Sequence, residues 1–373
     1  MRLVAVSAVT TTVCPMAGSF DAAVAALTAP SLEAAATTRE HLDRLTKPPG
    51  SLGQLETIAV QLAAIAGSSP PPVPAPVAVA VFAGDHGVVA QGVTPWPQEV
   101  TAQMVANFCA GGAAINVLAR HVGASVLVID VGVATDVADP GVGSPGGPQL
   151  VRSRVANGTQ DISTGAAMTS AEVVEALDVG AAVAARLIDE GARCLVTGDM
   201  GIGNTTASAA VIAVLTDRPA QEVTGRGTGI DDHRLAVKIS VVERAISRIA
   251  GKRDPIDVLR EVGGLEIAAL VGFIAGGAAA RVPVVIDGVI AAAAVLVAVE
   301  AAPGILPFVF AGHRSTEPGA SAVLSHVGLE PIIDLGLRLG EGSGACLAVP
   351  LLQAAAHLVG EMATFDSAGV TSK

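Results

Sequence analysis

Five short apolar runs, each followed by a segment long enough for a helix, constrain the fold of this chain more than any other feature. They begin after residue 76 and read VAVAVFA, SVLVIDV, RCLVTG, VPVVID and PFVFAG. Strands that alternate with helices in this way are typical of βαβ units, which build a parallel sheet with helices on its faces. The sequence therefore predicts an α/β fold with a parallel sheet, and a further short strand within LVRSRVA.

The chain before the first run is helical. DAAVAAL and SLEAAATTREHLDRL predict two helices within residues 21–45. Ser51 with Gln54 makes a capping-box signal for a third helix, which ends near Ala66. The segment SSPPPVPAP at residues 68–76 predicts a stiff linker, and we expect a domain boundary there.

The bulk composition narrows the range of partners. The 373 residues carry a formal net charge of −12, with 2% aromatic side chains and no Tyr. Such a chain lacks the positive electrostatic field that would attract nucleic acids or anionic membranes. It also has few aromatic rings on which bases could stack. We therefore expect neither nucleic acid nor a membrane as a partner, and any phosphate must be bound by local donors.

The cysteines predict neither disulfides nor a metal centre. No two are paired at CxxC spacing, so we expect small buried side chains in a reducing, cytoplasmic compartment; they are Cys14, Cys109, Cys194 and Cys346. We expect no metal and no cofactor. The N-terminal segment lacks a clear cleavage site and is interpreted as a tail. PVVIDGVIAAAAVLVAV predicts a buried strand to Ile286 and a helix from Gly288, rather than a membrane span.

A glycine-rich loop occupies the centre of the chain, in LVTGDMGIGNTTASAA. Gly201 and Gly203 remove side chains, so the backbone can approach a ligand closely. The polar residues able to cap the helix that follows are Asn204, Thr205 and Thr206. Free N–H groups at a helix start form an anion site, so the loop predicts a phosphate site. Neither the Walker nor the dinucleotide glycine spacing is present. The alternative is an ordinary turn that binds nothing.

Polar side chains follow or end each of the five strands. Ligands bind beyond the carboxyl ends of parallel strands, so these side chains predict a site at that edge of the sheet. They are Asp85 and His86, Asp130, Asp199, Asp287, and His313 with Arg314 and Ser315. The alternative for Asp130 and Asp287 is that each caps a helix.

Two further features carry chemistry. The loop TGRGTGIDD precedes a helix with Lys238, which can reach back to a phosphate or simply be solvated. Glu341 stands between Gly340 and Gly342, after a helix that starts near Glu317 and ahead of a largely apolar helix. A carboxylate among glycines and apolar residues has a raised pKa, which suits a general base or acid. The alternative is a charge that favours the helix start.

Six motifs now occur in one order: LTKPPGSLGQLE, FAGDHGV with GVTPWPQEVT, GDMGIGNTT, GGLEIAALVGFI, PVVIDG and RLGEGSGA. In this combination the chain resembles the nicotinate-nucleotide:5,6-dimethylbenzimidazole phosphoribosyltransferases of cobalamin nucleotide-loop assembly, over all but its two ends. The resemblance implies a homodimer with a Rossmann-like large domain and a small helical domain from both chain ends. We expect a tail over 1–20, the small domain over 21–76 and 316–373, and the large domain over 77–315.

The resemblance also implies roles for individual residues. It makes Glu341 the general base. It assigns the ribose, phosphate and nicotinate to Asp199, Gly201, Gly203, Asn204, Thr205, Gly227, Lys238 and Ser315. It assigns the benzimidazole pocket to Asp85, His86, Trp96, Met104 and Leu339. Asp199 stands where some members have Glu, so its shorter side chain makes a displaced or water-mediated contact.

The reaction of that family needs few groups. Nicotinate leaves the ribose as a neutral ring, so neither a metal nor a strong acid is required. One nitrogen of the benzimidazole attacks, a carboxylate removes the proton from the other, and the ribosyl centre inverts from β to α. In the dimer, one small domain helps to close the partner's site, and the helix EIAALVGFIAGGAAA can lie at the interface. Two alternatives stay open: another glycosyl-transferring enzyme such as a nucleoside phosphorylase, and a non-enzymatic phosphosugar-binding protein.

Overall fold

The structure is a computed structural model that describes residues 16–137 and 147–371. Its sheet has six strands in the order β3-β2-β1-β4-β5-β6, and every neighbouring pair is parallel. The strands are β1 (Val77–Gly84), β2 (Ser125–Gly132), β3 (Gln149–Arg152), β4 (Cys194–Met200), β5 (Val284–Ile286) and β6 (Val309–Ala311). The predicted Rossmann-like sheet and its short extra strand, β3, are confirmed. Residues 1–15 of the expected tail, Cys14 among them, lie outside the described residues, while a helix already begins at Ser19, two residues before the expected end of the tail.

The strand order creates a crevice beside the centre of the sheet. The chain runs outward from β1 to β2 and β3, then returns to form β4 on the other side of β1. All eight residues of β1 are buried, and Val81 pairs with Val128 on one side and Gly198 on the other. Beyond the carboxyl ends of β1 and β4, the loops diverge to opposite sides, which is where ligands bind in such sheets.

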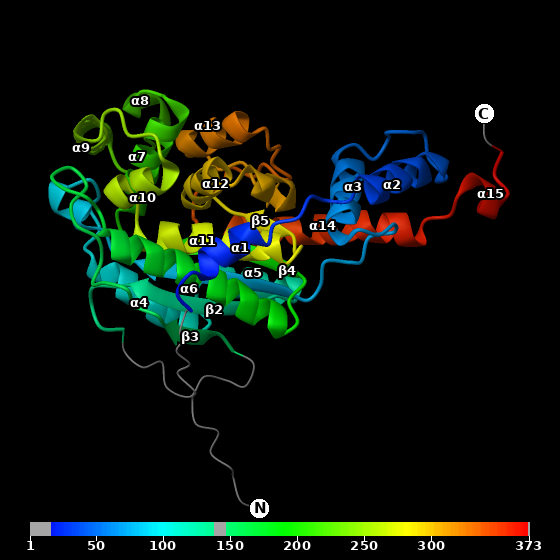
Figure 1. Cartoon of the computed structure of the whole chain (residues 1–373), viewed down its shortest axis with the longest axis horizontal. Helices are drawn as coiled ribbons and strands as arrows, with labels where there is room; N and C mark the ends of the chain where they lie inside the picture. Colours follow the sequence, from blue (N-terminus) through cyan, green and yellow to red (C-terminus); the bar gives the residue numbers. More distant parts are fainter. Residues whose placement is uncertain (1–15, 138–146, 372–373) are drawn as a thin grey trace, which may run out of the picture.

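Helices cover both faces of the sheet (Figure 1). On one face, α11 (Leu265–Ala279) contacts β1, β2 and β4, and Phe273 meets Phe82 edge to face with ring centroids 5.4 Å apart. The other face carries α4 (Glu99–Cys109), α5 (Ala114–Val122) and the start of α14 (Ser343–Glu361). Further helices of the sheet domain are α7 (Asn204–Thr216), α8 (Ala220–Val223), α9 (Asp232–Arg248), α10 (Pro255–Val262), α12 (Val289–Ala301) and α13 (Pro318–Val327), with the 3₁₀ turns η1 (Gly87–Gln91) and η2 (Pro303–Phe308).

The small-residue helix α11, expected at a subunit interface, is buried inside its own chain, which leaves it little surface for a partner. It crosses α6 (Ser170–Asp189) within the same chain, and its apolar residues are almost all buried there. A Cβ added at Gly272 would stand 1.9 Å from the carbonyl oxygen of Leu177, and one at Gly180 would stand 1.8 Å from that of Ala269. The glycines are therefore needed for close packing inside one chain.

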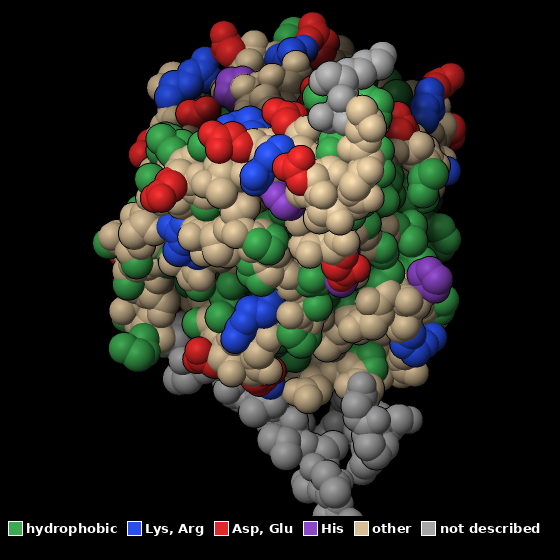
Figure 2. Space-filling model, turned by 90° about the vertical axis from the view of Figure 1, so that its right-hand side faces the viewer, with side chains coloured by type: hydrophobic (Ala, Val, Ile, Leu, Met, Phe, Trp, Pro, Cys, Tyr) green, Lys and Arg blue, Asp and Glu red, His purple; other side chains and the backbone are tan. Residues whose placement is uncertain are grey.

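Helices from both chain ends lie together beside the sheet domain (Figure 1). They are α2 (Leu32–Arg44), α3 (Gln54–Ala66), the far end of α14 and α15 (Phe365–Ala368). Leu45 pairs with Thr364 in an antiparallel bridge, which ties the two ends together. The small helical domain is therefore confirmed, while its exact boundaries stay a prediction. Helix α1 (Ser19–Ala25) lies against α6 and α11 instead. Figure 2 views the small-domain end and shows acidic and basic side chains interspersed with apolar ones.

Two predicted helix caps are wrong. Helix α3 starts at Gln54 after Gly53, so Ser51 is not its cap. Helix α7 starts at Asn204 after Gly203, and no side chain caps it. The amide of Asn204 instead donates to Asp199, as described below. The helix expected near Glu317 is confirmed, because α13 follows that residue directly.

The segment PVVIDGVIAAAAVLVAV forms β5 and α12, as predicted, and almost all of its residues are buried. Two other stretches among the described residues, Glu99–Val122 and Ser343–Glu361, are long and apolar enough to cross a membrane by length and composition alone. The second is α14, which packs between α3, α5 and β5. A buried core helix passes the same test.

Candidate active site

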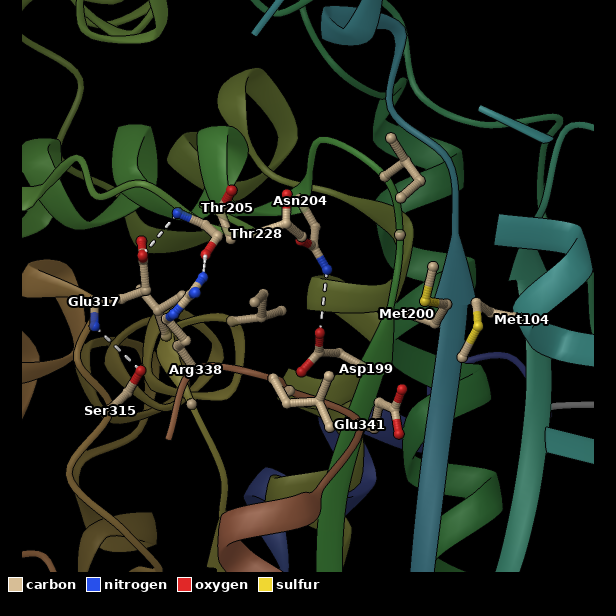
Figure 3. Close-up of a pocket in the computed structure, with 18 of the residues that line it drawn as sticks. Met104, Asp199, Met200, Asn204, Thr205, Thr228, Ser315, Glu317, Arg338 and Glu341 are labelled. Atoms are coloured by element: carbon tan, nitrogen blue, oxygen red, sulfur yellow. Dashed lines mark hydrogen bonds between the residues drawn. The ribbon is translucent and has the colours of Figure 1, made fainter. Parts of the chain in front are cut away.

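A cavity of ≈ 360 Å³ opens at the crevice beyond the carboxyl end of β4. Six segments line it: the first half of α4 with the loop before it, the loop after β4, the loop before α9, the start of α12, the segment after β6 and the glycine-rich turn before α14. It brings together eleven of the predicted residues, which are Trp96, Met104, Asp199, Gly201, Asn204, Thr205, Gly227, His313, Ser315, Leu339 and Glu341 (Figure 3). A smaller pocket of ≈ 50 Å³ shares several of these residues and adds Gly203 and Lys238.

Asp85 and His86 do not line the cavity, which corrects the expectation that they contact the benzimidazole. Both are fully buried, and His86 Nε2 lies 2.8 Å from an oxygen of Glu266, the second residue of α11. Gly201 covers them, because a Cβ there would stand 2.3 Å from the carbonyl oxygen of Gly84 and 3.4 Å from His86 Nε2. The pair therefore supports the glycine-rich loop from beneath.

The start of α7 is open towards the cavity. Its N-cap, Gly203, has φ 97°, a backbone conformation that favours glycine, and no side chain accepts from the first N–H groups. Thr205, in the first turn, accepts a hydrogen bond of 2.8 Å from Lys238 Nζ, which also donates to the Gly225 carbonyl at 3.0 Å. The N–H groups of Asn204 and Thr206 donate to the backbone carbonyls of Gly201 and Gly203. A helix start that no side chain caps and an ammonium therefore lie together where the sequence predicted a phosphate.

Lys238 is buried rather than solvated, with 2% of its surface exposed. Burial lowers the pKa of its ammonium to about 8, although the carboxylate of Glu317 raises it. Glu317 Oε1 accepts from the backbone N–H of Gly227 at 2.7 Å, and Arg338 Nη1 donates to the Gly227 carbonyl at 3.1 Å. The Gly227 loop is therefore held from both sides beside the phosphate site.

Sequence reasoning missed Glu317 and Arg338 as residues of the cavity, along with Met200 and Thr228 (Figure 3). The signals were present but weak. Glu317 stands two residues after Ser315, and its backbone N–H donates to Ser315 Oγ at 3.3 Å. Arg338 begins the RLGEGSGA motif. Each was read as part of a helix start or a motif flank, because its partner, Gly227, is remote in sequence.

Asp199 sits at the end of β4 in a cluster of carboxyl groups. Its Oδ2 accepts from Asn204 Nδ2 at 3.1 Å. Burial raises its pKa well above the usual range, the charges of Asp287, Glu266 and Glu341 raise it further, and the Asn204 hydrogen bond opposes them. Asp199 therefore holds its proton more readily than an exposed carboxyl group does. How its shorter side chain meets a ligand stays a prediction.

Glu341 sits in an unusual turn ahead of α14. Its own φ is 64°, and those of Gly340 and Gly342 are 85° and 92°. The side chain is buried, and its Oε2 accepts from the backbone N–H of Ile115 at 3.3 Å. Burial raises the pKa of Glu341, the Ile115 hydrogen bond lowers it, and the negative charge of Asp287 raises it. The expectation of a raised pKa is confirmed.

An apolar wall faces the carboxyl groups. Met104 on α4 and Met200 at the end of β4 lie side by side near Glu341 (Figure 3). Trp96 is half exposed at the rim, and its Nε1 donates to Thr228 Oγ1 at 3.1 Å. This part of the cavity suits a flat apolar ring, because polarizable thioethers and an indole pack well against aromatic faces.

Asp130 and Asp287, which the sequence predicted either to face a ligand or to cap a helix, have different partners. Asp287 does cap a helix, but that helix is α14 rather than α12, which follows it in the sequence. Asp130 accepts from the N–H of Val133 and from Arg154, and no helix starts there. Neither side chain lines the cavity.

Comparison with known proteins now gives the family. A phosphoribosyltransferase family model matches residues 27–370. The chain belongs to this family. A Salinispora tropica protein named nicotinate-nucleotide–dimethylbenzimidazole phosphoribosyltransferase is 54% identical over 349 residues, which are 91% of this chain and 96% of that protein. A Chloroflexus aurantiacus protein of the same name is 54% identical over 341 residues, which are 91% of this chain and 95% of that protein.

The fold of this phosphoribosyltransferase also matches a solved structure. The crystal structure of the nicotinate-nucleotide–dimethylbenzimidazole phosphoribosyltransferase from Thermus thermophilus aligns with a TM-score of 0.86 at 46% identity. The alignment covers 92% of this chain and 100% of the solved chain. Among the described residues, no group of three or more His, Cys, Asp or Glu side chains is arranged to hold a metal ion.

Proposed function

We propose that this chain transfers the 5-phosphoribosyl group of nicotinate mononucleotide to 5,6-dimethylbenzimidazole. The products are α-ribazole 5′-phosphate and nicotinate, and the first supplies the lower ligand of cobalamin. The observation that carries the proposal is that one cavity holds both an uncapped helix start beside Lys238 and a buried carboxyl group, Glu341, whose pKa is raised. The names of the relatives support it.

We propose that the nucleotide lies with its phosphate at the start of α7. The donors there are the first N–H groups of the helix, Thr205, the ammonium of Lys238 and the hydroxyl of Ser315. The ribose then extends towards Asp199 and Asn204, whose polar side chains can hydrogen-bond its hydroxyl groups. Anchoring the phosphate orients C1′ for attack, which supplies a large part of a rate enhancement without covalent chemistry.

The dimethylbenzimidazole packs between Met104, Met200 and Trp96, with its N–H towards Glu341. Its free ring nitrogen attacks C1′ from the α face, and the bond from C1′ to the nicotinate nitrogen breaks with its electron pair on nicotinate. Glu341 accepts the proton from the other nitrogen, so the product is a neutral benzimidazole. A base whose pKa is raised accepts this proton more readily than an exposed carboxylate would.

We also propose a cytoplasmic homodimer in which the small domain of one protomer helps to close the site of the other. Three large apolar side chains at or near the cavity rim are exposed in a single chain: Trp96 (49%), Leu335 (63%) and Leu339 (56%). A partner that covers them would remove apolar surface from water and close the cavity. Light scattering combined with an assay at nanomolar concentration tests this, and a fully active monomer would contradict it.

The function is tested by incubating the purified protein with nicotinate mononucleotide and dimethylbenzimidazole. Mass spectrometry should detect α-ribazole 5′-phosphate and an equal amount of nicotinate. A parallel incubation with inorganic phosphate in place of the benzimidazole separates the phosphorylase alternative, which would release ribose 1,5-bisphosphate. Binding of the nucleotide with no product in either incubation would instead favour a phosphosugar-binding protein.

A further inference from the structure

Asp287 takes no part in the reaction proposed above, yet it touches the turn that carries the base. It follows β5, and its side chain is completely buried. Its Oδ1 accepts from the backbone N–H groups of Gly344 at 2.8 Å and Ala345 at 2.9 Å, and its Oδ2 accepts from that of Gly342 at 3.1 Å. One carboxylate therefore binds three N–H groups around the start of α14.

We propose that Asp287 is a positioning residue for Glu341. Asp287 fixes the turn that carries Glu341, and it binds the N–H groups at the positive end of α14 so that Glu341 does not. The inference rests on the proposed function, because it concerns how the base of that reaction is held. An unoccupied helix start carries about half a positive charge and stabilises a nearby carboxylate. If Glu341 were bound there, it would stay ionised and become a weaker base. The carboxylate of Asp287 prevents this by satisfying the N–H groups itself.

The backbone around Glu341 needs such an anchor. Three consecutive residues, Gly340 to Gly342, have positive φ, and Glu341 is not a glycine. The turn is pressed onto β4, since a Cβ added at Gly198 would stand 2.6 Å from the Glu341 carbonyl oxygen. Asp287 is in turn fixed to β4, because its backbone N–H donates to Thr197 Oγ1 at 3.1 Å. The base is therefore tied to β4 and β5 through Asp287.

The charge of Asp287 also affects the ionisation of Glu341. The negative charge of Asp287 raises the pKa of Glu341. The other titratable side chains that face Asp287 in the described part of the chain are Asp199 on β4, the thiol of Cys346 on α14, and His313, whose Nε2 lies 3.3 Å from Asp287 Oδ1. Removing the Asp287 charge therefore leaves Glu341 easier to ionise.

The variant Asp287→Asn tests the proposal. Its amide oxygen can still accept from the helix start, but the charge is lost and an NH₂ group meets one of the N–H groups. The acidic limb of the pH profile of kcat/KM with dimethylbenzimidazole should move down by about one pH unit. We expect kcat to fall by about 10-fold and the Kd for nicotinate mononucleotide to stay within about 3-fold. Substrate titrations are common to all variants and cancel in the comparison.

Asp178→Asn is the matched control. Asp178 is also a buried carboxylate at a helix start, where it accepts from the N–H groups of Gly18 at 2.9 Å and Phe20 at 2.8 Å, but it lies on α6 and away from the cavity. Its loss should leave the pH profile and kcat unchanged. If Asp178→Asn moves the limb as far as Asp287→Asn does, the shift is a general effect of destabilisation and the proposal is wrong.

A second acceptor separates positioning of the base from a structural role. 1-Methylbenzimidazole has no N–H, so its attack on C1′ gives a stable cation and needs no base. Asp287→Asn should turn it over at the wild-type rate, within about 3-fold, as should Glu341→Gln. Should Asp287→Asn fail to fold, Asp287→Glu keeps the charge but displaces the turn, and its loss should likewise be confined to dimethylbenzimidazole.

Equal losses with both acceptors, or an unmoved limb in a folded Asp287→Asn variant, would overturn the proposal. These outcomes differ from failure of the proposed function, in which the wild-type protein itself forms no ribosylated benzimidazole from either acceptor.

Discussion

Helices α7 and α14 both point their starts at the cavity, and they treat those starts in opposite ways. Each begins after a glycine with positive φ, Gly203 at 97° and Gly342 at 92°, and neither has a side-chain cap of its own. At α14, Asp287 binds the N–H groups. At α7, the first N–H groups face the pocket that Lys238 also lines.

The difference assigns a role to each helix start. A helix start that no carboxylate occupies is an anion site, so α7 can bind the phosphate of the nucleotide. A start whose N–H groups are already satisfied has no such capacity, so α14 can present a carboxyl group without binding it. Both arrangements use glycine in the same backbone conformation. What separates them is a side chain that arrives from another strand.

The largest expected effect comes from the turn before α14, whose helix start Asp287 occupies. Glu341→Gln keeps the shape of the side chain but cannot accept a proton, so turnover with dimethylbenzimidazole should fall by ~10²–10⁴-fold. Steady-state kinetics measure this loss. Glu361→Gln, an exposed glutamate at the other end of α14, is the control and should be fully active. If Glu341→Gln keeps most of its turnover, the base lies elsewhere, and Asp199 becomes the next candidate.

The next largest effect concerns Lys238, beside the uncapped start of α7. Because Lys238 has a pKa of about 8, its charge is present below that pH and lost above it. The affinity for nicotinate mononucleotide should therefore weaken as the pH rises through about 8, and calorimetry from pH 7 to 9 measures this. Lys238→Met should bind the nucleotide about 10- to 100-fold more weakly at pH 7 and lose the pH step.

Lys252→Met is the control for this prediction, because Lys252 is partly exposed and pairs with Glu261 away from the cavity. It should keep both the affinity and the pH step of the wild type. A pH step that persists unchanged in Lys238→Met would mean that another group controls phosphate binding.

The smallest effect comes from a third helix start, outside the site. Helix α1 also follows a glycine with positive φ, Gly18, and Asp178 binds its N–H groups. Asp178→Asn should lower the free energy of unfolding by about 1–2 kcal/mol, because charge-assisted hydrogen bonds to the helix start are weakened. Chemical denaturation measures the loss, while turnover stays unchanged. Reduced turnover in this variant would mean that helix starts affect catalysis through stability alone.

The local pattern of the chain carried most of the fold and part of the site. Alternating apolar runs predicted the strands, and glycines flanking Asp199 and Glu341 pointed to loops that approach a ligand. These features depend on residues close together in sequence, such as the buried strand before the glycine-rich loop. The raised pKa of Glu341 followed from its apolar surroundings, which are also local.

The remainder depended on contacts between distant segments. Asp287 was expected to face a ligand or cap a nearby helix, but its three hydrogen-bond partners lie 55, 57 and 58 residues later in the sequence. His86 follows a strand as ligand-binding residues do, yet Glu266 is placed against it by α11. A strand end predicts the edge of the sheet on which a side chain lies, but it does not predict which later helix covers that side chain.

The most direct test of the account is calorimetry with nicotinate mononucleotide on Gly203→Ala and Glu341→Gln side by side, with one control variant. Gly203→Ala puts a methyl group 2.9 Å from Val89 in the start of α7 and strains a φ of 97°. Gly123→Ala is its control, a left-handed glycine at the end of α5 with no atom within 4 Å of the added Cβ.

We expect Gly203→Ala to weaken nucleotide binding by about 10-fold or more, and Glu341→Gln and Gly123→Ala to bind like the wild type, within about 3-fold. This result would assign the phosphate to α7 and the chemistry to the turn before α14. Wild-type affinity in a folded Gly203→Ala variant, or an equal loss in Glu341→Gln, would contradict that division.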